Sequence, residues 1–124
     1  MNDLYQDNIL DHAHNPRNKI SFEASFCGAI CGEGDNPSCG DSGEMCVVFV
    51  GQLISEVSWT GVGCAISQAS MSIVSDYVKG KSITDLRLLM PGDIYNLLGI
   101  QITPSRVNCA LLPYRAVEKI LEIC

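Results

Sequence analysis

Three cysteines stand in segments marked by glycine or proline, and together they could bind a metal. Cys39 follows Asn-Pro-Ser, Cys64 follows Gly-Val-Gly, and Cys109 follows Arg-Val-Asn. Thiolates bind zinc and iron, so three thiolates that a fold brings together would make a metal or iron–sulfur cluster site. Asp41 comes two residues after Cys39, and its carboxylate can join the same site where the backbone is extended. The predicted ligand set is Cys39, Asp41, Cys64 and Cys109.

The charges of this ligand set call for a cation. Three thiolates and one carboxylate could not be buried together without compensation, because burial would keep the thiols protonated. Zinc and an oxidised [2Fe–2S] cluster both accept tetrahedral thiolate sets, so the ligand types leave the two open. A carboxylate is a harder, weaker partner for iron than a thiolate is. Asp41 therefore predicts a site that releases what it holds.

Two of the three cysteines stand where helices are expected to begin. Cys64 lies where a strand gives way to a helix, and Cys109 opens the last predicted helix. Unpaired backbone N–H groups at such a position lower the pKa of a thiol. Arg106, three residues before Cys109, would further favour a thiolate or bind a charge carried on sulfur.

Composition narrows the classes of partner. The chain has 124 residues, the size of one domain spanning 1–124, and a net charge of −6. Because it has no cluster of Lys and Arg, we expect neither nucleic acid nor an anionic membrane as a partner. No apolar run reaches the length of a membrane span, and the acidic start does not match a secretory signal, so we expect a cytoplasmic protein.

The remaining cysteines are expected to be small buried side chains. The chain has seven cysteines, and a disulfide framework would fit poorly in a reducing compartment. A buried cysteine often packs simply as a small hydrophobe. We assign this packing role to Cys27, Cys31, Cys46 and Cys124, without further function.

The hydrophobic pattern predicts an α+β fold. A helix over 3–13 precedes strands over 22–31, 44–50 and 53–60, and a turn-rich loop over 32–41 carries Cys39. The period then changes to 3.6, which indicates helices that end at Gly80, near Met90, at Gly99 and near residue 123. Strands followed by helices favour a three-stranded antiparallel sheet covered by helices on one face.

At these residues the chain resembles the U-type iron–sulfur scaffold family, which includes IscU, SufU and the N-terminal domain of NifU. The resemblance covers nearly the whole chain. It rests on the three cysteine segments, on Leu4-Tyr5 with Asp11-His12, on Asn15-Pro16-Arg17-Asn18, and on Tyr77-Val78-Lys79-Gly80-Lys81.

The resemblance implies a SufE/NifU-like fold and a non-catalytic scaffold on which a [2Fe–2S] cluster is built. Sulfur would come as persulfide from a cysteine desulfurase, iron from a separate donor, and the cluster would pass to apo acceptor proteins. The three cysteines would be ligands and sulfur acceptors, and Asp41 would be the ligand whose weakness permits release.

The chain departs from both subtypes of the family. IscU-type members carry histidine immediately before the third cysteine, whereas this chain has Asn108. They also carry a Leu-Pro-Pro-Val-Lys segment that a dedicated chaperone binds, whereas residues 102–107 of this chain have a different sequence. Arg106 before Val-Asn-Cys is nearer SufU, but only 44 residues separate Cys64 from Cys109, which leaves little room for SufU's extra segment. A zinc-dependent sulfurtransferase that accepts persulfide sulfur, and a structural zinc domain, therefore stay open as alternatives.

Overall fold

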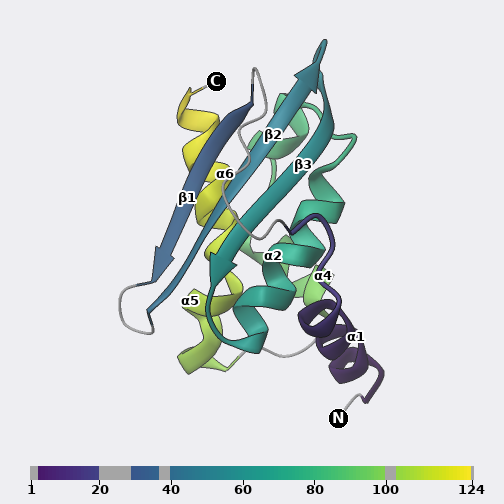
Figure 1. Cartoon of the computed structure of the whole chain (residues 1–124), viewed down its shortest axis with the longest axis vertical. Helices are drawn as coiled ribbons and strands as arrows, with labels where there is room; N and C mark the ends of the chain where they lie inside the picture. The colour runs from purple at the N-terminus through teal and green to yellow at the C-terminus, as the bar shows by residue number, and fades with distance from the viewer. Residues whose placement is uncertain (1–2, 20–28, 37–39, 100–102, 124) are drawn as a thin grey trace.

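A three-stranded antiparallel sheet lies against a layer of helices in this computed structural model, which describes residues 3–19, 29–36, 40–99 and 103–123 (Figure 1). The strands lie in the order β1-β2-β3 and span Ile30–Asn36, Asp41–Val50 and Leu53–Val62. The helices are α1 Asp3–His14, α2 Ala65–Val78, α3 Ile83–Arg87, α4 Pro91–Leu98, the 3₁₀ turn η1 Pro104–Arg106, α5 Val107–Ala110 and α6 Leu112–Ile123. The predicted α+β class and antiparallel sheet are confirmed.

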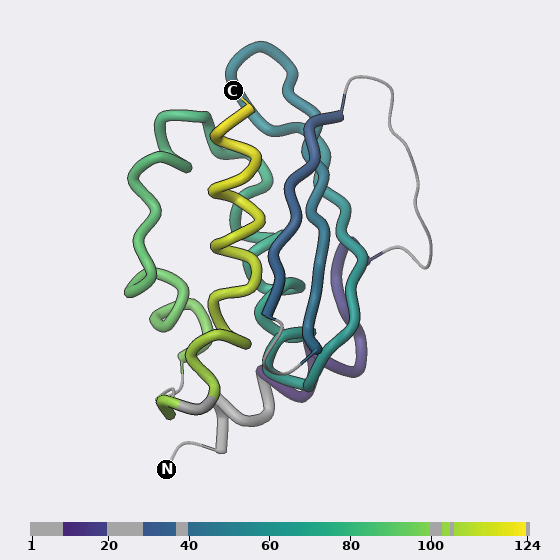
Figure 2. The backbone as a smooth tube through the Cα atoms, turned by 90° about the vertical axis from the view of Figure 1, so that its left-hand side faces the viewer, coloured from purple at the N-terminus to yellow at the C-terminus, as the bar shows by residue number. Residues whose placement is uncertain are grey.

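One face of the sheet is covered by helices. The α6 helix packs against β1 and β2, and α2 packs against β3. Figure 2 shows α3, α4 and α6 on the same side of the sheet. The core fills the space between the layers, and its largest side chains with no more than 1% exposure include Trp59, Met45, Ile94, Leu112 and Ile120. None of the described helices is long and apolar enough to cross a membrane.

The first strand differs from its prediction. Residues 22–28 of the predicted strand lie outside the described residues, and β1 continues through Asn36, where a loop was expected. Its pairing with β2 places Gly32 opposite Met45 and Gly34 opposite Gly43. A Cβ on Gly32 or Gly34 would collide with carbonyl oxygens of α6. The two glycines are thus required by the close approach of a helix to a strand, and they do not mark a turn.

The helices that follow β3 in the sequence begin and end at residues that favour helix ends. The α2 helix ends just before Gly80, whose φ is +87°. The α3 helix begins with a capping box between Ser82 and Asp85 and ends at Arg87, before the predicted end near Met90. Pro91 opens α4, and Gly99, with φ of +73°, ends it. Proline suits a helix start because its missing N–H would be unpaired there anyway, whereas glycine suits the position after a helix because it readily adopts a positive φ.

The last predicted helix is divided in two. The chain forms α5 over Val107–Ala110 and begins again at Leu112, so Cys109 lies inside α5 and does not open the long helix as predicted. Pro113 explains why the longer helix begins where it does. The proline has no N–H to donate, and only in a first turn would that N–H be unpaired anyway.

Buried hydroxyl groups join the N-terminal region to α2. The Ser72 hydroxyl accepts a hydrogen bond from the Arg17 backbone N–H at 2.7 Å, and it pairs with Nδ1 of His12 at 2.7 Å. The indole N–H of Trp59 donates to the Arg17 carbonyl at 2.7 Å. These contacts hold α1 and its exit segment against α2 and β3.

Candidate metal centre

Three of the four predicted ligands meet at the end of the sheet where β2 begins. One ligand atom each from Asp41, Cys64 and Cys109 lies within 4.8 Å of the others. Asp41 is the first residue of β2, Cys64 precedes α2, and Cys109 lies in α5. The fourth predicted ligand, Cys39, lies outside the described residues.

The spacing suits a single metal ion. Donor atoms around a tetrahedral zinc at about 2.3 Å stand about 3.8 Å from one another. The thiol of Cys64 lies 3.8 Å from Oδ2 of Asp41. The remaining separations within the cluster, at most 4.8 Å, need only small side-chain rotations to match. Two thiols and a carboxylate are also a donor set that zinc or iron accepts.

Cys64 is the thiol better prepared to ionise. It occupies the N-cap position of α2 and is partly exposed. Burial raises the pKa of the Cys64 thiol, but hydrogen bonds from the backbone and hydroxyl of Ser67, from the Cys109 thiol and from the backbone of Ile66 outweigh it. The pKa of Cys64 is therefore below the ordinary cysteine value. The prediction that a helix start favours a thiolate here agrees with this direction.

Cys109 is the thiol that stays protonated in the absence of a metal. It is fully buried, and burial, together with its hydrogen bonds to Asp41 and Cys64, raises the pKa of Cys109 to about 12. Asn36, at the end of β1, donates from its side-chain amide to the Cys109 sulfur at 3.9 Å. The two neighbouring thiols thus differ: one ionises readily and the other needs a cation before it gives up its proton.

Arg106 supplies positive charge beside both thiols. The charge of Cys64, and then the hydrogen bond and charge of Cys109, raise the pKa of the Arg106 guanidinium. Its side chain is exposed at the rim of the cluster. The guanidinium therefore lies where the sequence suggested, within reach of a negative charge on either sulfur.

Gly63 sets the position of the buried carboxylate. Asp41 is only 3% exposed. A Cβ on Gly63 would stand 2.8 Å from Cγ of Asp41 and would collide with the Ser67 hydroxyl. The Ser67 hydroxyl donates to the Cys64 carbonyl at 2.9 Å and lies 3.7 Å from its sulfur. Only glycine leaves room for Asp41 and Ser67 to approach the same cysteine.

Two residues that contact the thiols of Cys64 and Cys109 were not predicted from the sequence. Asn36 was placed in a loop, so nothing pointed to its amide, and Ser67 was read only as part of a helix. Asn108, the residue where IscU-type chains have histidine, accepts a hydrogen bond from Arg115 at 3.0 Å. This pairing occupies the Asn108 side chain outside the three-residue cluster.

The packing role assigned to Cys31 and Cys46 was wrong. The two residues form a disulfide between β1 and β2, where they are directly opposite in the register. The pair was missed because a disulfide was not expected in a reducing compartment, and because the sequence does not show that Cys31 and Cys46 are opposite each other in the register. Cys27 and Cys124 lie outside the described residues, and Cys64 and Cys109 are free thiols.

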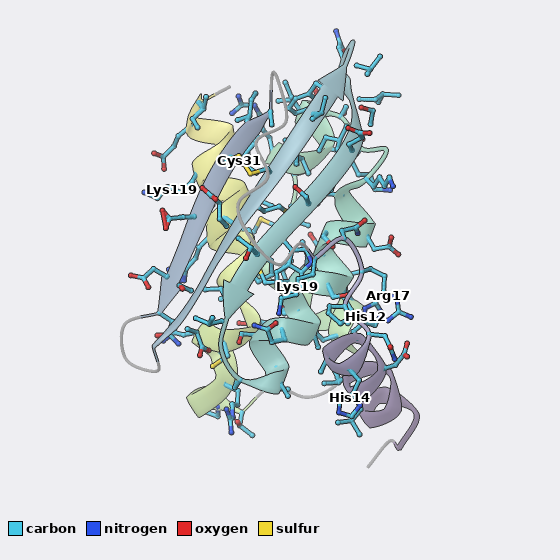
Figure 3. All side chains as sticks on the ribbon, viewed as in Figure 1. His12, His14, Arg17, Lys19, Cys31 and Lys119 are labelled. Atoms are coloured by element: carbon cyan, nitrogen blue, oxygen red, sulfur yellow. A yellow bond between two sulfur atoms is a disulfide. The ribbon has the colours of Figure 1, made fainter. Side chains whose placement is uncertain are left out.

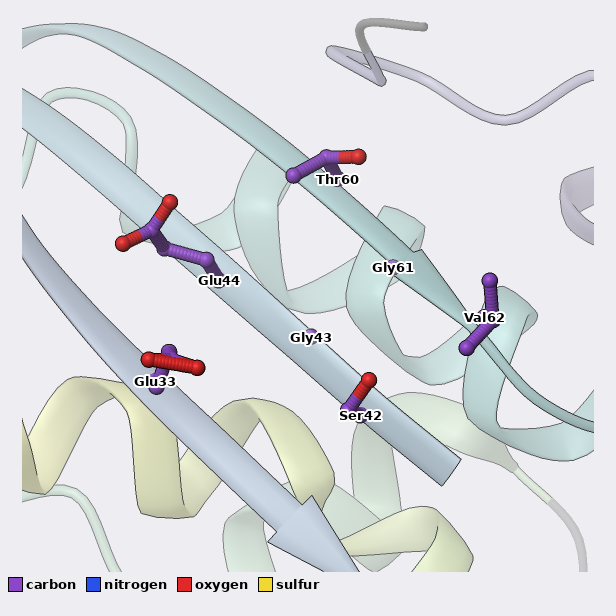
Figure 4. Close-up of a pocket in the computed structure, with 7 residues that line it drawn as sticks. All are labelled: Glu33, Ser42, Gly43, Glu44, Thr60, Gly61 and Val62. Carbon is purple, nitrogen blue, oxygen red and sulfur yellow. The ribbon is translucent and has the colours of Figure 1, made fainter. Parts of the chain in front are cut away.

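A groove of about 250 Å³ lies on the outer face of the sheet (Figure 4). It is lined by Glu33, Ser42, Gly43, Glu44, Thr60, Gly61 and Val62. None of the three clustered ligands lines it. Val62 stands at one end of the groove and is 63% exposed, two residues before Cys64.

Comparison with known proteins places the chain in a family. Residues 4–122 match the model of the NifU-like N terminal domain. The zinc-dependent sulfurtransferase SufU of Bacillus subtilis is 32% identical, with 94% of this chain and 88% of that protein covered. The scaffold protein IscU of Escherichia coli K12 is 29% identical, with 92% and 88% covered.

Comparison with solved structures supports the same family. A candidate iron–sulfur cluster assembly scaffold of the SUF system from Fervidobacterium islandicum superposes with a TM-score of 0.66 at 29% identity, covering 90% of this chain and 92% of that one. A hypothetical protein superposes with a TM-score of 0.78 at 26% identity, covering 98% and 99%. The chain therefore belongs to the family of NifU-like N-terminal domains.

Proposed function

We propose that this chain, as one domain over residues 1–124, is a scaffold for iron–sulfur cluster assembly. It binds a nascent [2Fe–2S] cluster and transfers it to acceptor proteins. The observation that carries the proposal is the meeting of Asp41, Cys64 and Cys109 within 4.8 Å in a chain of this family. The ligand set is completed by Cys39, two residues before Asp41.

The different surroundings of the ligands suit assembly followed by release. Cys64 is partly exposed and ionises readily, so it can meet an incoming atom first. Cys109 is buried and loses its proton to solvent only when a metal ion takes the proton's place on sulfur, so it closes the site after iron arrives. The carboxylate of Asp41 is a weaker ligand for iron than the thiolates are. Its bond to iron therefore breaks first when the cluster leaves.

The partners follow from this role. A cysteine desulfurase supplies sulfur, an iron donor supplies iron, and apo iron–sulfur proteins accept the cluster. Support comes from the relatives named as cluster assembly scaffolds. A cytoplasmic location fits the free thiols of Cys64 and Cys109, whereas the Cys31–Cys46 disulfide would persist there only if it resists reduction or is oxidised again. In this role the chain is a carrier and not an enzyme.

A second function is favoured by two observations. Arg106 stands beside both thiols, and Asn108 is paired with Arg115. The same site could hold zinc and accept persulfide sulfur, as a zinc-dependent sulfurtransferase would, with the guanidinium binding the charge of the transferred sulfur. The relative from Bacillus subtilis carries that name.

Anaerobic reconstitution separates the two functions. The chain is incubated with iron, cysteine and a cysteine desulfurase, and the product is mixed with an apo-ferredoxin. A scaffold develops visible absorption that moves to the ferredoxin. A chain that stays colourless, keeps one zinc and only accelerates the desulfurase is a sulfurtransferase, and this result would exclude the scaffold.

A further inference from the structure

The Cys31–Cys46 disulfide lies on the face of the sheet opposite the metal centre. Gly32 and Gly34 face α6, so Cys31, which alternates with them, faces away from the helices (Figure 3). Cys31 is partly exposed, whereas Cys46 is 7% exposed. Cys31 is therefore the more exposed partner of the bond, and we take its sulfur as the one that a thiol reagent attacks.

The strand that this bond holds is weak by its own sequence. Between Cys31 and Asn36, β1 contains two glycines and two acidic residues, all residue types depleted in strands. Among the strands of the described residues it stands at the edge of the sheet and pairs with β2 alone. At Gly32 and Gly34, β1 contributes no side chain to its contact with α6. A covalent bond to Cys46 therefore adds to the backbone pairing with β2 and the packing against α6 in holding β1.

The far end of the same strand supports the metal centre. Asn36 is the last residue of β1, is 4% exposed, and donates its amide to the sulfur of Cys109. Asn36 is also paired with Asp41 in the register of the sheet. Loosening β1 from β2 would consequently disturb the surroundings of two of the clustered ligands.

We propose that Cys31 and Cys46 form a reversible redox site, which dithiol reductants open and dithiol-derived disulfides close, and which determines how firmly β1 is held. Its influence on the metal centre rests on the function proposed above. In the first step a thiolate of the reductant attacks the Cys31 sulfur, forms a mixed disulfide and releases Cys46. The second thiol of the reductant then displaces Cys31, and the reductant leaves as a cyclic disulfide. Two electrons and two protons pass from the reductant to the two cysteines.

The redox site is tested on the full chain with mixtures of dithiothreitol and its oxidised form. Free thiols are alkylated and mapped by mass spectrometry, and hydrogen exchange is followed for residues 30–36, with residues 65–78 as an internal reference. Reduction is expected to free Cys31 and Cys46 together. It should also speed exchange in β1 by about tenfold, equivalent to about 1.4 kcal/mol of local stability, while α2 keeps its rate.

Two double variants show whether the change in exchange comes from the Cys31–Cys46 bond. The double variant Cys31→Ser/Cys46→Ser should show the fast β1 exchange at every reductant concentration, with α2 exchange showing that it is folded. The control Cys27→Ser/Cys124→Ser should respond to dithiothreitol as the parent does. If Cys31 and Cys46 remain alkylatable under oxidising conditions, or β1 exchanges equally fast in both states, the redox site is refuted.

The coupling to the metal centre has its own readout. Both the parent and the Cys31→Ser/Cys46→Ser variant are loaded with zinc, and transfer to a coloured chelator is timed without reductant. The variant should release zinc about tenfold faster, and equal rates would refute the coupling through Asn36. A parent chain that binds neither zinc nor a cluster would refute the proposed function instead. Hydrogen exchange in β1 would still show whether Cys31 and Cys46 form the proposed redox site.

Discussion

Gly63 lies directly against the buried carboxyl group of Asp41, where a Cβ would stand 2.8 Å from Cγ of the aspartate. Gly63 also immediately precedes Cys64, so one position in the backbone governs how closely two of the predicted ligands approach each other. This contact joins the end of β3 to the start of β2, two segments that are distant in the sequence. The glycine before the second cysteine is thus a packing requirement of the site.

Replacing this glycine is expected to weaken metal binding. In Gly63→Ala, the new methyl group pushes Asp41 and Ser67 away from Cys64, so zinc affinity should fall by about 10- to 100-fold, as when a ligand loses its orientation. Competition with a chelator measures the change. Gly92→Ala is the matched control, because a Cβ at Gly92 meets nothing within 4 Å. Equal zinc affinity in both variants would show that Asp41 is not positioned by Gly63.

Removal of the carboxylate is expected to slow cluster release. Because a carboxylate is the weakest iron ligand of the set, Asp41→Ala should hold a reconstituted cluster roughly several times longer than the parent does. The decay of visible absorption during transfer to apo-ferredoxin gives the rate. Asp35→Ala removes an exposed carboxylate from β1 and should leave the rate unchanged. An unchanged cluster lifetime in Asp41→Ala would take Asp41 out of the ligand set.

The two thiols are expected to titrate in different pH ranges in the metal-free protein. Iodoacetamide reacts with thiolates, and the pKa of Cys64 lies below the ordinary value of 9.0 while that of Cys109 is raised to about 12. Alkylation of Cys64 should therefore rise with pH well before alkylation of Cys109. Quantitative mass spectrometry of the two peptides between pH 6 and pH 10 measures this. Faster reaction at Cys109 than at Cys64 at pH 8 would contradict the assignment.

The buried hydroxyl of Ser72 is expected to stabilise the fold. Ser72 is fully buried and has two short hydrogen bonds, one to the Arg17 backbone N–H and one to the His12 ring. Ser72→Ala leaves the Arg17 N–H without this acceptor, so the free energy of unfolding should fall by about 1–3 kcal/mol. Urea denaturation measures it. Ser55→Ala, at an exposed position of β3, should change the stability far less, and equal losses would argue against a special role for Ser72.

Local signals predicted most of the helical half of the fold. Gly99 ends α4 where the sequence predicted, because glycine readily adopts the positive φ found after a helix end. Cys64 was expected at a helix start because the period of the apolar residues changes just after it. The candidate ligands Asp41, Cys64 and Cys109 could be predicted because the residues next to each of them, above all glycine and proline, already mark these segments in the sequence.

Features that depend on contacts between distant segments could not be predicted. The glycines of β1 were read as turn residues, since only the position of α6 shows that a side chain there would collide. The Cys31–Cys46 bond needs the register of β1 on β2, which no local pattern contains. The contact of Asn36 with Cys109 follows from the same register, and the break at Leu111 depends on how α5 and α6 pack.

The metal and sulfide content of the anaerobically reconstituted chain, with its visible spectrum, tests most directly whether this site assembles an iron–sulfur cluster. We predict iron and inorganic sulfide in equal amounts, with visible absorption that is lost in Cys64→Ser. A colourless chain that holds one zinc and no sulfide after the same treatment would contradict it.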